Sequence, residues 1–280
     1  MCRLFAQISP TAQAARDFLV DSEFSLLRQS DFNKKNLQKD GWGVASFGNK
    51  KGPTVSKSPN PMFQEARKVE ALAAEIRSTL VIGHIRAASN PRGVSKKKLI
   101  TFDNTQPFSG RGWAFAHNGT LEIPLEIAKK LGPYRRELKA LNDSEVYFWQ
   151  FMKFNAKLKD PALALKACVR EIWDVWKECR SRYPAKKTPY TSLNAIAGDG
   201  RRLYALNHYV RKGLADCGVC NPAQPWSVMS FARRGRRLIV ASENMDRKKW
   251  TRLAQPEILS AEIKGGRLSV RRERFEVAIQ

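Results

Sequence analysis

Three strand–turn–strand patterns in the last third of the chain limit its possible folds more than any other feature. Each pattern has two apolar-rich stretches on either side of a glycine-containing turn: residues 192–197 and 203–207, 228–232 and 238–241, and 258–263 and 268–278. This arrangement is typical of β-hairpins, because a tight turn often needs a residue that accepts positive φ. We therefore expect antiparallel sheet at the C-terminal end.

Helices are predicted in the middle of the chain and strands near its start. Helical spacing and strong helix formers occur in residues 65–77, 122–131, 143–157 and 161–178. Short apolar runs typical of strands occupy residues 2–9, 44–47, 79–85 and 113–117, whereas residues 11–28 fit one or two helices and residues 28–40 a loop. Together these elements predict an α+β fold. Because neither a repeat nor a Pro- or Ser-rich linker divides the sequence, we expect residues 1–280 to form a single domain.

The composition excludes several classes of protein. Hydrophobic residues make up 42% of the 280 residues, which is more than a disordered chain contains. No run of about 18 uncharged apolar residues is present, so no membrane span is expected. The first residues, MCRLFAQIS, lack the long apolar core of a secretory signal. The five cysteines, an odd number, favour reduced thiols and hence a cytoplasmic location.

The strong positive charge of the chain suggests an anionic partner. The formal net charge is +24, and basic residues cluster at 96–98, 233–237 and 271–274. Such clusters either bind a polyanion nonspecifically or form the solvated face of a sheet. No helix-turn-helix, zinc-finger or aromatic RNA-binding pattern accompanies them. Nucleic-acid binding is therefore the alternative function, and a partner-docking protein with an inactive site is the third.

Cys2 is the first candidate for chemistry. Removal of Met1 would leave a cysteine with both a thiol and an α-amine, and the amine has an ordinary pKa of about 8. A nucleophile that is activated by its own terminal amine is an established arrangement. The alternative is a buried apolar cysteine on a terminal strand.

Three further motifs carry polar groups at the ends of predicted elements. Arg86 follows an apolar strand and could hold a carboxylate bidentately, or form a structural ion pair. Asn118 and Gly119 could donate two N–H groups to one oxyanion, or form a plain tight turn. Asp143 could hold an ammonium group, or cap the helix predicted from residue 143, where Ser144 is a second possible cap.

In this order, the motifs resemble those of a known family. The initial Met-Cys is followed by GWG (41–43), GHIRAAS (83–89), NTQPF (104–108), FAHNG (115–119) and NDSE (142–145). This series is similar to that of the class II glutamine amidotransferases, which are N-terminal-nucleophile hydrolases. The chain most resembles the stand-alone members without a synthase domain, a branch that includes γ-glutamyl hydrolases of glutathione and thiol-histidine metabolism. The resemblance implies a four-layer αββα sandwich with two antiparallel sheets, and no metal or organic cofactor.

The resemblance also implies roles for individual residues. The substrate would be glutamine or a γ-glutamyl amide, and the released ammonia could pass to a partner synthase, which the basic surface could dock. The implied roles are Cys2 as nucleophile with its amine as base, Asn118 and Gly119 as oxyanion hole, Arg86 for the α-carboxylate, Asp143 for the α-amino group and Ser89 as a substrate contact.

Two positions depart from the pattern of the synthase-linked members. Ala87 and Asn90 stand where those members have Trp and His, two residues that shape the glutamine pocket. A roomier pocket would suit a γ-glutamyl amine or peptide.

Other cysteines and histidines are expected to be structural. Cys217 and Cys220 have the spacing of a zinc knuckle, but even with His208 they provide fewer than the roughly four ligands of structural zinc. We therefore expect no metal. His84 and His117 lie at the ends of apolar strands and are expected to be structural, because the terminal amine would make a histidine base unnecessary.

Overall fold

The backbone forms two antiparallel sheets. The computed structural model describes residues 2–48, 51–140, 142–210, 219–221 and 224–277. The seven-stranded sheet has the order β11 (Thr251–Arg252), β9 (Ser230–Arg234), β10 (Arg237–Ala241), β1 (Arg3–Ala14), β4 (Arg77–Ile85), β2 (Trp42–Phe47) and β3 (Pro53–Ser58). The six-stranded sheet has the order β13 (Arg267–Arg274), β12 (Glu257–Lys264), β8 (Arg202–Asn207), β7 (Asn194–Gly198), β6 (Trp113–Asn118) and β5 (Phe108–Gly110).

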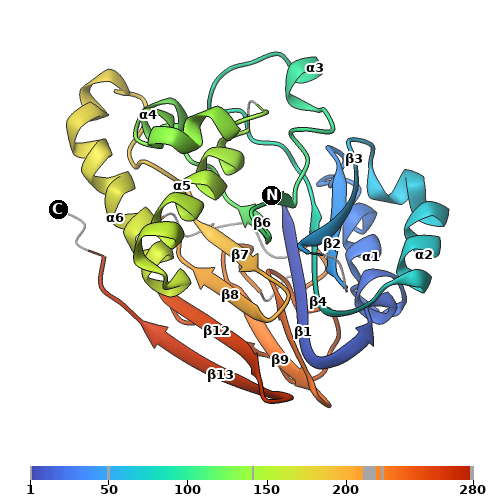
Figure 1. The fold of residues 1–280 in the computed structure, drawn as a ribbon. Helices are drawn as coiled ribbons and strands as arrows, with labels where there is room; N and C mark the ends of the chain where they lie inside the picture. The colour runs from blue at the N-terminus through green and yellow to red at the C-terminus, as the bar shows by residue number, and fades with distance from the viewer. Residues whose placement is uncertain (1, 49–50, 141, 211–218, 222–223, 278–280) are drawn as a thin grey trace.

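Helices cover the outer face of each sheet (Figure 1). The seven-stranded sheet carries α1 (Leu26–Asp31) and α2 (Ala66–Glu75). The six-stranded sheet carries α4 (Pro124–Lys129), α5 (Asp143–Leu158) and α6 (Pro161–Cys179). Short turns of helix complete the set: η1 (Asp17–Asp21), η2 (Met62–Glu65), α3 (Lys96–Leu99), η3 (Gly132–Glu137) and η4 (Arg180–Arg182). The predicted four-layer αββα sandwich is confirmed.

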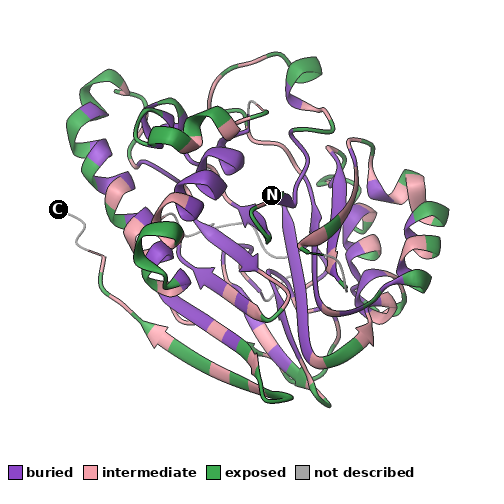
Figure 2. Ribbon diagram, viewed as in Figure 1, coloured by how far each residue is buried: buried purple, intermediate pink, exposed green. Residues whose placement is uncertain are grey.

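Side chains alternate between the two faces of each strand, and this alternation places the core. Leu4 of β1, Ile82 of β4 and Ala116 of β6 belong to the apolar layer between the sheets. Their neighbours face the helices: Phe5 packs under α1, and Phe115 packs under α5. Figure 2 shows the resulting contrast between the buried central strands and the exposed edge strand β13. Because the repeat is two residues, a side chain two positions beyond an inward-facing residue also points between the sheets.

Two segments near the start of the chain differ from the sequence-based expectation. Strand β1 continues to Ala14, so the helix expected from residue 11 is wrong at its start. The end of this strand pairs again with β4, at Gln13 opposite Ser78 and after a register shift, and this backbone pairing holds polar residues in the sheet. Strand β3 was not predicted, because its sequence PTVSKS is largely polar and lies at the edge of the sheet. The three C-terminal hairpins are confirmed as β7–β8, β9–β10 and β12–β13, but the last strand ends at Arg274, earlier than expected.

Candidate active site

Cys2, Arg86 and Asn118 lie at the ends of three strands, on the same side of the sandwich. β1 pairs with β4 so that Arg3 is opposite Ile85, which puts Cys2 beside Arg86. Asn118 ends β6, which contacts both β1 and β4 from the other sheet (Figure 1). All three residues continue the inward-facing series of their strands. The two sheets therefore direct a thiol, a guanidinium and an amide into one space.

The Cys2 thiol is buried and therefore hard to ionise. Its Sγ lies 3.5 Å from the Ala87 carbonyl oxygen, and only 8% of the residue is exposed. Burial raises the pKa of the Cys2 thiol, although the nearby Arg86 guanidinium acts in the opposite direction. Since the thiolate is the nucleophilic form, Cys2 needs a base that removes its proton during attack.

The Arg86 guanidinium is held as a buried cation. Its Nη1 donates to the Leu99 carbonyl at 3.0 Å, and the residue is 2% exposed. Burial lowers the pKa of Arg86, while the charges of Cys2, Asp143 and Asp40 raise it. Asp40 also accepts the Ala88 N–H at 2.9 Å and so fixes the backbone after Arg86. Sequence analysis missed Asp40, and the only available signal was a carboxylate directly before GWG.

Asp143 does not cap the helix that it begins, and neither does Ser144. The N-cap of α5 is Asn142, whose extended backbone (φ −82°, ψ 132°) lets its side chain accept the Ser144 N–H at 2.8 Å. Both predicted caps are therefore wrong. The Asp143 carboxylate instead accepts the Leu121 N–H at 2.8 Å and is 4% exposed. Burial raises the pKa of Asp143 to about 6, although the Leu121 N–H and Arg86 act against this shift.

The side-chain amide of Asn118 is completely buried and has no hydrogen-bond partner within the described residues. Both its Oδ1 and its Nδ2 are unpaired, although the backbone of Asn118 pairs normally with Asn194 of β7. Leaving a buried polar group unpaired costs about 1–3 kcal/mol, so an unpaired amide in a folded protein needs an explanation. A ligand that accepts a hydrogen bond in this space would provide one.

Gly119 is required because another part of the backbone passes very close to it. A Cβ at this position would lie 1.9 Å from the Ser192 carbonyl oxygen. The predicted tight turn at Asn118 and Gly119 is wrong: β6 pairs with β5 and β7, and the chain continues from Gly119 to a bridge between Leu121 and Tyr190. Gly119 is thus a bend directly after the end of β6.

The NTQPF segment joins the end of β6 to the start of α5. The Gln106 amide accepts the His117 N–H at 2.7 Å and donates to the His117 carbonyl at 3.2 Å. Asn142 donates to the Asn104 carbonyl at 2.8 Å. The segment passes over Gly43, where a Cβ would lie 2.4 Å from the backbone carbonyl oxygen of Gln106. Gly43, the second glycine of the GWG motif, therefore makes room for this connection.

The histidines near the site are neutral. His117 Nδ1 lies 2.9 Å from the Ser144 hydroxyl and Nε2 lies 2.9 Å from the Ser192 carbonyl, so Nε2 carries the proton and donates it. Burial lowers the pKa of His117 to about 4 and, together with the Arg86 charge, lowers the pKa of His84 to about 3. Both rings are therefore uncharged near pH 7.

The remaining candidates lie apart from this arrangement. Ser89 is half-buried in the irregular segment after Arg86, and it forms no hydrogen bond with the other candidate residues among those described. Cys217 lies outside the described residues, and His208 bonds Tyr190 and Gln255. Over the described ranges, no three His, Cys, Asp or Glu side chains are grouped so that they could hold a metal ion. None of the helices described there has the length and apolar character needed to span a membrane.

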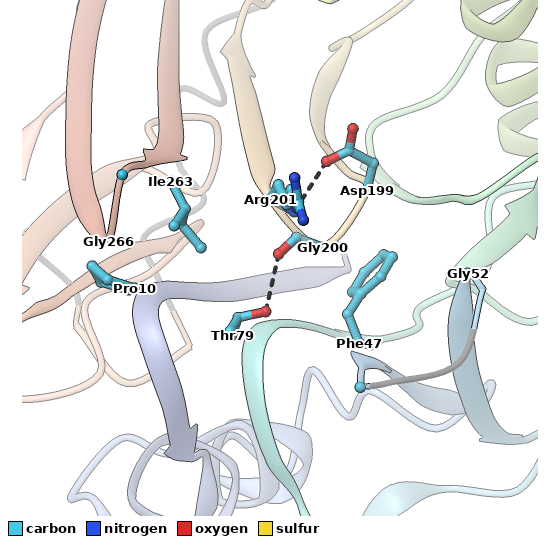
Figure 3. Close-up of a pocket in the computed structure, with 11 residues that line it drawn as sticks. Pro10, Phe47, Gly52, Thr79, Asp199, Gly200, Arg201, Ile263 and Gly266 are labelled. Atoms are coloured by element: carbon cyan, nitrogen blue, oxygen red, sulfur yellow. Dashed lines mark hydrogen bonds between the residues drawn. The ribbon is translucent and has the colours of Figure 1, made fainter.

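A separate hollow lies at the opposite end of the sandwich (Figure 3). It measures about 500 Å³ and is lined by hairpin turns from both sheets. Thr79 is near the start of β4, whereas Arg86 follows the end of that strand, so the two ends of the molecule are distinct. The Thr79 hydroxyl donates to the Gly200 carbonyl at 3.0 Å, which links the two sheets here.

Comparison with known proteins gives a family and related folds. The family described as class-II glutamine amidotransferases matches residues 1–216. The Escherichia coli K12 protein YafJ, which carries the name of a glutamine amidotransferase, is 38% identical over 87 residues, which is 30% of this chain and 31% of that protein. The chain thus spans less than one third of this relative in the match.

Two solved structures share the fold. A glutamine aminotransferase class-II domain protein from Silicibacter pomeroyi superimposes with a TM-score of 0.63 at 18% identity, covering 96% of this chain and 98% of that one. The glutamine phosphoribosylpyrophosphate amidotransferase of B. subtilis gives 0.59 at 15% identity, covering 97% of this chain and 49% of that one. At these identities the two structures support the fold alone.

Proposed function

Because the chain belongs to the class II glutamine amidotransferase family, we propose that it hydrolyses the γ-amide of glutamine or of a γ-glutamyl conjugate. The observation that carries this proposal is the buried amide of Asn118, which has no partner in the described part of the chain and points into the same space as Cys2. An oxyanion hole needs a donor that is fixed before the reaction and has no other partner. The Asn118 side chain is completely buried, and its Nδ2 has no partner among the described residues, which supports this role.

Arg86 and Asp143 provide opposite charges for the amino-acid end of the substrate. Each affects the pKa of the other, so the two lie close together, yet no ion pair between them is found among the described residues. Arg86 would bind the α-carboxylate, and Asp143 would bind the α-ammonium group. We include Ser89 as a substrate contact because it follows Arg86 on the same segment. This pair of charges would select an α-amino acid with an amide side chain.

The proposed reaction begins after Met1 has been removed. The free α-amine of Cys2 takes the thiol proton, and the thiolate forms a bond to the γ-carbonyl carbon of the substrate. The carbonyl electron pair moves onto oxygen, which accepts hydrogen bonds from Asn118 Nδ2 and the Gly119 N–H. The C–N bond then breaks, and the leaving amine takes the proton from the α-ammonium group of Cys2. The product of this half-reaction is a γ-glutamyl thioester.

Water completes the reaction by the same steps. The α-amine removes a proton from water as the hydroxyl adds to the thioester carbon, and the same oxyanion hole holds the negative oxygen. The C–S bond then breaks, and the thiol regains its proton. The overall change is hydrolysis of one amide bond, without any change in oxidation state. The family also suggests transfer of the released ammonia to a partner synthase.

The residues after Arg86 affect which substrates we expect the site to accept. Ala87 carries only a methyl group, and its carbonyl contacts the Cys2 thiol. Ala87 is half-buried, and Asn90 is exposed. We propose that these small or exposed side chains leave room for a substituent on the γ-amide nitrogen. Substrates would then include γ-glutamyl amines and peptides as well as glutamine.

The test is reaction with a diazo-ketone analogue of glutamine, followed by intact and peptide mass measurement. The Cys2 thiolate should displace dinitrogen and form one thioether, in a chain that has lost Met1. Cys2→Ser provides the matched control, because it keeps the fold and removes the reactive sulfur. A chain that retains Met1 and gains no adduct would contradict the proposed function.

We propose a second, separate property for the end of the sandwich shown in Figure 3, namely nonspecific binding of nucleic acid. Exposed cations lie at the turns of three hairpins there: Arg201, Arg236, Lys264 and Arg267. Arg236 donates to the Gly266 carbonyl at 3.3 Å, so the turns of β9–β10 and β12–β13 lie side by side. Adjacent cations from both sheets could contact the phosphates of one duplex.

Retention on a random DNA duplex at several salt concentrations tests this second property. Affinity should fall steeply as salt rises, and changing the four cations to Ser should reduce the log–log slope by up to about one per cation. The control changes Lys96, Lys97 and Lys98 to Ser. These lysines are also exposed, but they lie in α3 and not at the hairpin turns. Binding that does not depend on salt, or that is lost equally in the control, would exclude the proposed surface.

A further inference from the structure

A completely buried ion pair lies directly beside the candidate nucleophile. The Arg3 Nε is 2.7 Å from the Glu243 Oε2, and each side chain is only 1% exposed. The Arg3 Nη1 also donates to the carbonyl oxygen of Cys2 at 2.9 Å. Burying two charges is costly unless their remaining hydrogen-bonding atoms find partners. The arrangement therefore needs a reason beyond simple stability.

The Glu243 carboxylate is saturated with donors. Besides Arg3, it accepts the backbone N–H groups of Val219 at 2.8 Å, Cys220 at 2.6 Å and Asn221 at 2.7 Å. Three successive N–H groups that converge on one carboxylate hold both oxygens in place. The carboxylate thus has a fixed position and cannot follow Arg3 if Arg3 moves. Arg3 is consequently held by an anchor from a distant part of the chain.

The anchor continues the pairing of β10 with β1. The ladder ends with Phe5 opposite Ala241, and Ser242 then bonds Leu4 twice: its N–H donates to the Leu4 carbonyl at 3.0 Å and its hydroxyl accepts the Leu4 N–H at 2.8 Å. Glu243 is the next residue and reaches Arg3. The contacts therefore proceed residue by residue along β1 and finish at the carbonyl of Cys2.

We propose that Arg3 and Glu243 are positioning residues for Cys2. This proposal rests on the proposed function, in which Cys2 begins the mature chain. A first residue has no preceding peptide plane to restrain it, so its orientation depends on the rotation about its Cα–C bond. A hydrogen bond to the Cys2 carbonyl fixes that rotation, and thereby places the α-amine and the thiol relative to the substrate. Misplacement of a reacting group by about 1 Å can reduce a rate by about 10²-fold.

Arg3→Lys tests the role without removing a charge. The lysine can pair with Glu243, but its single nitrogen cannot also hold the Cys2 carbonyl in the way that the arginine fork does. We expect kcat to fall about 10- to 100-fold, with KM within about two-fold of wild type, because the proposed roles of Arg3 and Glu243 involve no contact with the substrate. Glu243→Gln, which releases the anchor of Arg3, should have the same effect on kcat.

A second measurement does not require a substrate. Alkylation of Cys2 by iodoacetamide, mapped by peptide mass, reports how readily the thiol loses its proton at each pH. If Arg3 aligns the α-amine with the thiol, the midpoint of this reaction should move to higher pH in Arg3→Lys. Electrostatics alone would not produce this rise, because the substitution conserves the charge.

Glu257 and Arg272 provide the matched control. Glu257 is also buried, and it accepts Arg272 Nε at 2.9 Å and a backbone N–H of Ala254. Glu257→Gln and Arg272→Lys should lower the unfolding temperature without changing kcat or the alkylation profile. In this pair the carboxylate is buried and Arg272 is partly exposed, so it separates loss of an ion pair at a buried carboxylate from loss of the one beside Cys2.

The outcomes are distinct. Wild-type kcat and an unchanged alkylation profile in both folded variants would overturn the positioning role, as would equal losses in the control pair. Failure of both variants to fold while the controls fold would assign the pair to stability and would likewise overturn it. If the alkylation profile shifts as expected but wild-type protein hydrolyses no γ-glutamyl amide, the proposed function fails and the positioning role stands.

Discussion

Asn118 and Asn194 are directly opposite each other on β6 and β7, yet only one of their side-chain amides is satisfied. The Asn194 amide donates to the Ser227 carbonyl at 2.7 Å and accepts the His208 N–H at 2.8 Å. The Asn118 amide, equally buried, has no partner among the described residues. Two identical side chains in one ladder thus differ: that of Asn194 is structural, and we propose that the side chain of Asn118 binds a ligand.

Asn118→Ala should separate activity from stability. We expect kcat to fall about 10²- to 10³-fold through loss of one oxyanion donor, while the unfolding temperature stays close to that of wild type. Asn194→Ala should show the reverse, because it leaves a carbonyl and an N–H without partners. Steady-state hydrolysis and thermal unfolding of both variants provide the measurement. Turnover of Asn118→Ala within a few-fold of wild type would disprove the assignment.

Asp143→Asn should stabilise the fold and weaken substrate binding. The pKa of Asp143 is raised by burial from 3.8 to about 6, so keeping it ionised at pH 7 costs on the order of 3 kcal/mol. This cost develops as pH rises from about 4 to about 6, and it is absent at lower pH. The asparagine keeps an acceptor for the Leu121 N–H. Urea unfolding should therefore show a gain at pH 7 that disappears below pH 4, and a loss at pH 7 would contradict this account.

The same carboxyl group predicts the acid side of the pH profile. Below about pH 6, Asp143 becomes protonated and can no longer attract the α-ammonium group of the substrate. The value of kcat/KM, which reports the free enzyme, should fall up to about tenfold per pH unit there. Asp143→Asn should be much less active and should lose this contribution, so that only the fall due to protonation of the Cys2 α-amine remains. A wild-type profile that stays flat down to pH 5 would exclude an ionised Asp143 from substrate binding.

Gly119→Ala should disrupt the end of β6. The added methyl carbon would lie 1.9 Å from the Ser192 carbonyl oxygen, so the strand end or the neighbouring segment must move. We expect both a lower unfolding temperature and a large loss of kcat. Gly48→Ala is the matched control, since a Cβ there has no neighbour within 4 Å. Equal stability of the two variants would show that the structure relaxes around Gly119.

Much of the sandwich could be predicted from the sequence, because its elements carry local patterns. β4 and β6 contain short continuous apolar runs, and the C-terminal strands are separated by glycine turns. Motifs at the start of β1 and at the ends of β4 and β6 made it possible to name Cys2, Arg86 and Asn118 as candidates. The structure brings the three together, because side chains at even positions of β1, β4 and β6 face the same space.

Features that depend on distant contacts could not be predicted. Asp40 lies in a polar segment, and its carboxylate matters only because it meets the Ala88 N–H. Arg3 and Glu243 are separated by 240 positions, and no local pattern relates them. The prediction of the N-cap residue of α5 was wrong for another reason. Asn142, Asp143 and Ser144 are all good N-cap residues, and only backbone geometry distinguishes them.

The central place of β1 has a consequence for synthesis of the protein. This strand precedes all the other described strands, but one of its two neighbours, β10, is more than two hundred residues later in the chain. Until the ribosome has released β10, β1 has one uncovered edge, and exposed edges invite pairing with other chains. The residues of β1 are thus made before those of β10 and have both neighbouring strands only after β10 is made. A nascent chain would carry its cysteine for most of translation without the neighbours that hold it for reaction.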